Sequence, residues 1–135
     1  MMKGTILTSS QNLSFSKDIV KHLPQAVRKK LPADIGIIAV SEKKSQALNR
    51  TYRGKDKATN VLSFFYSKGY GEIIVCPAVI RREAKAAGHL FEYQMTWMIV
   101  HGMLHLSGVH HEGSLRAGRT FERIEQGVLR KIEKG

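Results

Sequence analysis

Some segments of the chain have the apolar pattern of strands, and others have apolar residues every three to four positions, as helices do. The short β-branched stretch "KGTILTS", residues 3–9, predicts a first strand. Helical spacing starts near Ser16, and Pro24 should begin a new segment inside it, because proline interrupts the hydrogen bonds of a helix interior. The apolar run "DIGIIAVS", residues 34–41, then predicts a buried strand.

A capped helix is predicted directly after this strand. Ser41 can accept a hydrogen bond from the first turn of a helix over residues 42–53. Apolar residues recur at helical spacing in this segment, and we expect Ala47, Leu48 and Tyr52 to face the core.

Two further strands should form an antiparallel hairpin after the polar loop "GKDKATN". They are residues 61–66 and 72–77, joined by the glycine-bearing segment "SKGYG". Pro77 ends the second strand and can open a helix over residues 78–88, because proline is tolerated in the first turn of a helix.

Two helices complete the predicted fold. A long helix runs from about Phe91 to Leu106 and should end at Gly108, and a last helix covers residues 115–134. The apolar residues expected to face inward on this last helix are Phe121, Ile124, Val128, Leu129 and Ile132. Strands and helices mix without strict alternation, which indicates a single α+β domain over residues 1–135, with a small mixed four-stranded sheet packed with about five helices.

Charge and cysteine content indicate which partner and which compartment to expect. The chain has 22 Lys and Arg against 11 Asp and Glu, a formal net charge of +11, which suits a polyanionic partner such as nucleic acid. A basic surface that serves only solubility is the alternative. The single cysteine, Cys76, excludes an internal disulfide and fits a reducing compartment. Because we find no signal-peptide core and no apolar run of membrane-spanning length, we expect a cytoplasmic protein without membrane contact.

Three histidines in "VHGMLHLSGVHH", residues 100–111, carry the candidate chemistry. His101 and His105 are one helical turn apart, so their imidazoles can converge on one point. Gly108 permits a left-handed turn, after which the chain can double back and present His111. Three imidazoles leave a fourth position of a tetrahedral zinc ion for water or substrate, which is typical of a catalytic site. The alternative is three unrelated histidines, but four of the six in the chain lie between residues 101 and 111.

The spacing H-x3-H-x2-G-x2-H matches the metzincin metalloproteases. In that pattern a glutamate general base follows the first histidine, whereas this chain has Gly102. A zinc peptidase is therefore disfavoured. A metal ion could still activate water for attack on a phosphorus atom, and the missing side chain at Gly102 could admit a larger substrate group beside the metal.

Two motifs together resemble the YbeY family of bacterial metal-dependent endoribonucleases. They are "HGMLHLSGVHH" and the upstream stretch "LNRTYRGKDKATNVLSF", followed by "GEIIVCP". The resemblance covers residues 45–112 well. It implies an α+β fold with a zincin-like metal helix, and one zinc ion held by His101, His105 and His111. In that family the residue before the last histidine is usually Asp, and this chain has His110.

The same resemblance implies hydrolysis of single-stranded RNA, with roles in ribosomal RNA maturation and ribosome quality control. Ribosomal RNA and the ribosome or its proteins would be the partners. The arginine of "YRGKD" is functionally important in the family, and here it is Arg53. A non-catalytic ribosome- or RNA-binding factor with a structural metal is the competing interpretation.

Arg53, Lys55 and Lys57 are the candidate RNA contacts. A guanidinium can grip a phosphate through two parallel hydrogen bonds and offset charge that develops during phosphoryl transfer, so Arg53 joins His101 as a candidate catalytic residue. Its alternative is an ordinary surface ion pair with Asp56. The two lysines are expected to contact the RNA backbone without base selectivity, and plain solvated charge is the alternative for both.

Overall fold

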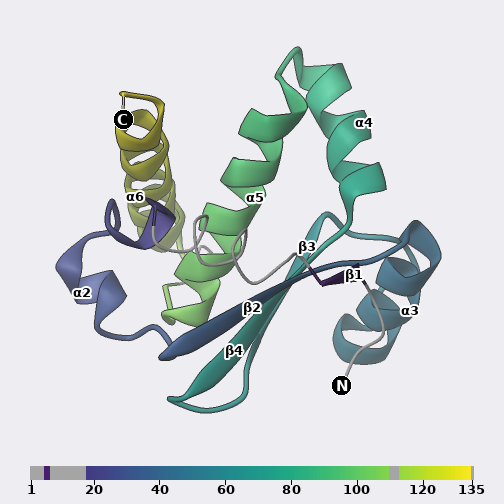
Figure 1. Cartoon of the computed structure of the whole chain (residues 1–135), viewed down its shortest axis with the longest axis horizontal. Helices are drawn as coiled ribbons and strands as arrows, with labels where there is room; N and C mark the ends of the chain where they lie inside the picture. The colour runs from purple at the N-terminus through teal and green to yellow at the C-terminus, as the bar shows by residue number, and fades with distance from the viewer. Residues whose placement is uncertain (1–4, 7–17, 110–112, 135) are drawn as a thin grey trace.

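The computed structural model of the chain describes residues 5–6, 18–109 and 113–134. Its strands are β1 (Thr5–Ile6), β2 (Asp34–Ala39), β3 (Val61–Phe65) and β4 (Tyr70–Val75). Its helices are α2 (Gln25–Arg28), α3 (Glu42–Arg53), α4 (Pro77–Ala87), α5 (Phe91–Leu106) and α6 (Leu115–Lys134). Figure 1 shows α5 between α6 and α4, above the sheet. The predicted α+β fold is confirmed, and none of the described helices is both long and apolar enough to span a bilayer.

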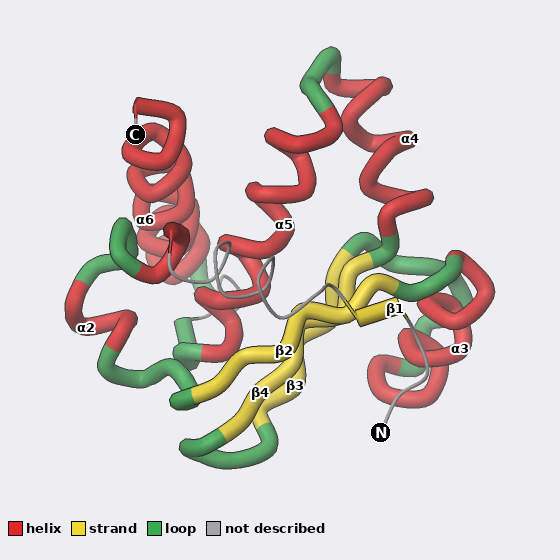
Figure 2. Tube along the Cα trace, in the orientation of Figure 1, coloured by secondary structure: helices red, strands yellow, loops and turns green. Residues whose placement is uncertain are grey.

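The sheet is mixed, with the strand order β1-β2-β4-β3. β2 pairs with β4 in parallel, and β3 pairs with β4 in antiparallel orientation as the predicted hairpin. These three strands have five or six residues each, whereas β1 adds only a two-residue antiparallel pairing to β2. Figure 2 shows the paired strands running together beneath α5. The order places β3 at one edge of the sheet.

Sequence signals account for the ends of several helices. The Ser41 hydroxyl accepts a hydrogen bond from the backbone N–H of Lys44 at 3.1 Å and so caps α3, as predicted. Pro24 precedes α2, and Pro77 occupies the first turn of α4, where a missing N–H costs no helical hydrogen bond.

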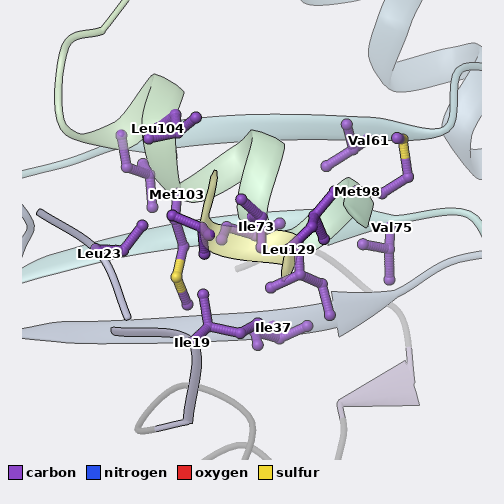
Figure 3. Packing of buried hydrophobic residues seen from close by; sticks show 14 of the residues in the cluster. Ile19, Leu23, Ile37, Val61, Ile73, Val75, Met98, Met103, Leu104 and Leu129 are labelled. Atoms are coloured by element: carbon purple, nitrogen blue, oxygen red, sulfur yellow. The ribbon is translucent and has the colours of Figure 1, made fainter. Parts of the chain in front are cut away.

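Alternate residues of the strands belong to two separate apolar clusters, one on each face of the sheet. Ile37 and Ile73 point to the face covered by α5 and α6, and both are fully buried there. Figure 3 shows this larger cluster, with Met103 from α5 and Leu129 from α6 packed against the strands. Residues of the other parity pack on the opposite face with Leu48 of α3. The sheet is therefore covered on both faces, and its β3 edge borders the candidate site.

The inward orientation predicted for Tyr52 is wrong. Ser45, Leu48 and Asn49 form the buried face of α3, while the Tyr52 side chain is 59% exposed. Tyr52 shares that helical face but lies on the last turn, beside the edge strand. Its ring meets Phe64 of β3 edge-on, with centroids 5.0 Å apart, and the rest of the ring faces solvent.

Candidate active site

His101 and His105 lie on one face of α5, a helix that is otherwise largely buried. α5 runs from Phe91 to Leu106 as predicted, and it packs against β3, β4, α4 and α6. The two imidazoles are half-buried and face a cavity. One turn of helix separates them, so their rings lie side by side with centroids 4.8 Å apart.

The two imidazoles converge through their Nε2 atoms, which lie 3.2 Å apart. Two nitrogens bound to one tetrahedral zinc ion at the usual bond length lie about 3.3 Å from each other. The observed separation fits a hydrogen bond between the two rings and also fits a shared cation, so this pair of side chains could hold a zinc ion.

Glu125 of α6 forms a hydrogen bond with Nδ1 of His101, on the side of the ring opposite His105. Its Oε2 lies 2.7 Å from His101 Nδ1, and the side chain is only 7% exposed. An ionised carboxylate can only accept hydrogen bonds, so it favours the imidazole form whose Nδ1 carries the proton. Nε2, the nitrogen nearest His105, is then left with its lone pair.

Sequence analysis did not identify Glu125. The signal was nevertheless present, because a glutamate occupies an apolar helical face together with Phe121, Val128 and Leu129. A carboxylate at such a position indicates a buried polar partner, but the sequence does not show that the partner is His101.

α5 ends at Gly108 as predicted. Gly108 adopts a positive φ of 87°, its N–H donates to the carbonyl of His105, and the N–H of Val109 donates to the carbonyl of Leu104. This pair of bonds is the Schellman arrangement that terminates a helix at glycine. His111, the third predicted ligand, and His110 lie outside the described residues. Within residues 5–6, 18–109 and 113–134, no group of three or more His, Cys, Asp and Glu side chains is placed to hold a metal.

Gly102 packs closely against the sheet and does not line the cavity, which gives no support to the hypothesis that it makes room for a substrate group. A Cβ atom at this position would lie 2.9 Å from Cγ2 of Ile73 and 3.0 Å from Oγ of Ser63. Glycine lets α5 approach β3 and β4 closely, and the Ser63 hydroxyl donates to its carbonyl at 3.0 Å.

A cavity of about 530 Å³ runs along β3 and joins the histidines to the end of α3. Arg53, at the last position of α3, lines it together with His101 and His105. The other lining residues are Tyr52, Thr59, Asn60, Val61, Leu62, Ser63, Phe64, Phe65 and Leu106. The fold thus brings a guanidinium and two imidazoles to one cavity.

The loop 54–60 is held against α3 by buried polar side chains. The Asn49 amide donates to the carbonyl of Lys57 at 2.8 Å, and the Ser45 hydroxyl donates to the carbonyl of Thr59 at 2.8 Å. Lys55 and Lys57 are exposed on this loop, and neither lines the cavity with Arg53.

Asp56 lies beside Arg50 and not beside Arg53, the partner considered from the sequence. Its Oδ1 is 3.6 Å from Nη1 of Arg50, and it also accepts a hydrogen bond from the Gln46 amide at 3.1 Å. The surface ion pair considered for Arg53 is thus formed by Arg50.

Exposed aromatic rings surround the cavity and continue along the sheet. Tyr52 and Phe65 line the cavity and are 59% and 53% exposed. Beyond them, the hydroxyls of Tyr66 and Tyr70 donate to the buried carboxylate of Glu72 at 2.9 and 2.7 Å. Desolvation, followed by these hydrogen bonds, raises the pKa of Tyr66 to about 12 and the pKa of Tyr70 to about 12.

The fold and the paired imidazoles together define an α+β protein with a candidate metal site on its central helix. A family model described as "Endoribonuclease YbeY" matches residues 3–133, so the chain belongs to the YbeY family.

Three relatives described as "Endoribonuclease YbeY" illustrate the match. The chain is 34% identical to one from Thermotoga petrophila over 127 residues (91% of this chain, 85% of the relative) and 37% identical to one from Stenotrophomonas maltophilia over 131 residues (89% and 79%). It is 44% identical to one from Neisseria gonorrhoeae over 92 residues, 60% of this chain. The match spans 54% of that relative, and about half the length of the Neisseria meningitidis relatives as well.

A solved structure has a similar fold. The solution structure of a Thermotoga maritima protein matches 99% of this chain and 93% of its own length, with a TM-score of 0.59 and 26% sequence identity. The helices and strands of the two proteins are therefore arranged in a similar way.

Proposed function

We propose that the protein is a zinc-dependent endoribonuclease that cuts single-stranded RNA. The observation that carries the proposal is the convergence of His101 and His105 at 3.2 Å in a cavity that Arg53 also lines. Membership of the endoribonuclease family supports the reaction class. His101, His105 and His111 would hold the single ion on a zincin-like helix, with His111 as the third ligand.

The metal ligands and Arg53 would have different roles in phosphodiester hydrolysis. A bound divalent ion supplies a Lewis acid that activates water and offsets phosphate charge. Arg53 reaches the same cavity from α3 and grips two phosphate oxygens with its guanidinium, which stabilises the charge that develops as the bond to the leaving oxygen lengthens. The described walls of β3 and α5 exclude bulk solvent from one side and so strengthen this attraction.

The surroundings of the cavity suit unpaired RNA. Tyr52 and Phe65 offer exposed rings on which unstacked bases can pack, and a base held inside a duplex has no free face for them. Lys55 and Lys57 contact the backbone, and the net charge of +11 favours a polyanion. The family resemblance supports ribosomal RNA as the substrate, ribosomal proteins as partners and ribosome quality control in the cytoplasm as the setting.

Cleavage of a labelled single-stranded RNA tests the proposal. We expect cleavage that stops with a chelator, returns with zinc, and is lost in His101→Ala. His22→Ala is the matched control, because His22 lies outside the cavity, and it should cleave as the wild type does. Cleavage that survives both chelation and His101→Ala contradicts the proposal. RNA binding without any cleavage identifies instead a binding factor with a structural metal.

A further inference from the structure

We propose that Glu125 is a positioning residue that sets the orientation and the protonated nitrogen of His101 for metal binding. The inference rests on the proposed metal site, but it does not depend on RNA cleavage.

The burial of Glu125 is costly for the fold. The residue is 5% exposed and lies on the inner face of α6, where Phe121, Val128 and Leu129 are 2–3% exposed. Removing a carboxylate from water is unfavourable by several kcal/mol unless hydrogen bonds and opposite charge compensate. An apolar side chain of similar size would avoid this burial cost, but it could not accept the hydrogen bond from His101.

The hydrogen bond between Glu125 and His101 fixes the orientation of the imidazole ring. The 2.7 Å distance from Oε2 to Nδ1 of His101 is typical of a strong hydrogen bond to a charged group. With the proton held on Nδ1, the lone pair of Nε2 points to the position that His105 Nε2 also borders. Phe121 packs edge-on against the His101 ring, with centroids 4.9 Å apart, and limits its rotation.

The negative charge has a second effect on the proposed metal site. A carboxylate behind a histidine makes the ring a better electron donor and offsets part of the charge of a divalent ion. Loss of such a partner typically lowers metal affinity about 10- to 100-fold. Glu125 therefore acts on the ion through His101 and does not need to touch it.

Metal titration of the intact protein tests this role. Co²⁺ is a suitable probe, because its absorption bands report the geometry of its ligands, and competition with a chelating dye gives the affinity. We expect Glu125→Leu to bind Co²⁺ about 10- to 100-fold more weakly than the wild type. Glu125→Gln, which keeps the shape and an acceptor oxygen without the charge, should lie between the two. Glu122→Gln is the matched control, because Glu122 is exposed on the same helix, and its affinity should not change.

The thermal stability of the metal-free variants separates positioning from a structural role. Metal-free Glu125→Leu should melt close to the wild-type temperature, because the variant loses the hydrogen bond to His101 together with the burial cost of the carboxylate. The proposal is overturned if Glu125→Leu binds Co²⁺ with wild-type affinity and spectrum. It is also overturned if the variant loses thermal stability while the folded fraction keeps wild-type affinity. Wild-type protein that binds neither Co²⁺ nor Zn²⁺ overturns the metal site together with the role of Glu125.

Discussion

Arg53 and His105 line the same cavity, although β3, β4 and α4 lie between them in the sequence. Arg53 ends α3 on one side of the edge strand, and His105 lies near the end of α5 on the other side. The free edge of β3 therefore separates the group expected to bind phosphate from the imidazoles expected to bind the metal.

Replacement of Arg53 should impair catalysis more than RNA binding. Arg53→Ala is expected to lower kcat for RNA cleavage by about 100-fold, as is typical when a donor to a developing negative charge is lost, with a much smaller change in the Kd for the RNA. Arg53→Lys should recover only part of this, because an ammonium cannot form two parallel hydrogen bonds. Arg50→Ala is the control from the same helix, since Arg50 contacts Asp56. Equal losses in the Arg50 and Arg53 variants would show that only general positive charge is needed.

The exposed rings should recognise bases and not backbone charge. Phe65→Ala and Tyr52→Ala are each expected to weaken binding of single-stranded RNA by about 1 kcal/mol or more, the usual contribution of a base stacked on an aromatic ring. An abasic strand of equal length should bind the variants and the wild type alike, as measured by fluorescence anisotropy. Leu115→Ala removes a residue that is 79% exposed elsewhere and serves as the control. A parallel loss on the abasic strand would rule out base stacking.

A methyl group at Gly102 should destabilise the fold. Gly102→Ala places a carbon 2.9 Å from Ile73, and such overpacking outweighs the gain in helix propensity, so we expect a net loss of about 1 kcal/mol in the free energy of unfolding. Gly127→Ala provides the matched comparison on α6, where an added Cβ atom would meet no neighbouring atom within 4 Å among the described residues, and it should stabilise by up to about 1 kcal/mol. Urea denaturation of both variants checks the opposite signs, and a stabilised Gly102→Ala would mean that α5 has room against the sheet.

Tyr66 and Tyr70 should make stability fall in strongly alkaline solution. Their pKa values are about 12 in the folded protein, above the usual value near 10, so the neutral hydroxyls are favoured by folding. Their contribution is fully present below about pH 10 and is lost as the pH rises through about 12. Absorbance titration at the tyrosinate band, with Tyr66→Phe and Tyr70→Phe to assign the transitions, measures this. Transitions of both residues near pH 10 would contradict the role of Glu72.

Local structure was largely predictable, because its determinants are close in the sequence. Ser41 and Pro77 mark the starts of α3 and α4, and Gly108 marks the end of α5. Each acts on a backbone hydrogen bond within a few residues of itself, so the sequence pattern contains the whole cause.

Relationships across the fold were not predictable in the same way. The direction of Gly102 depends on how α5 is rotated against β4, and the partner of Glu125 depends on how α6 docks on α5. Tyr52 was expected inside because helical periodicity does not show where the sheet ends. These features follow from tertiary packing, which a single sequence specifies only through many weak interactions.

Anomalous diffraction at the zinc edge, from crystals of the protein prepared with zinc, locates the ion that His101 and His105 are proposed to hold. We expect one strong peak within bonding distance of Nε2 of both His101 and His105, with His111 as the third ligand. A peak elsewhere, or none at these imidazoles, would contradict the proposed metal site.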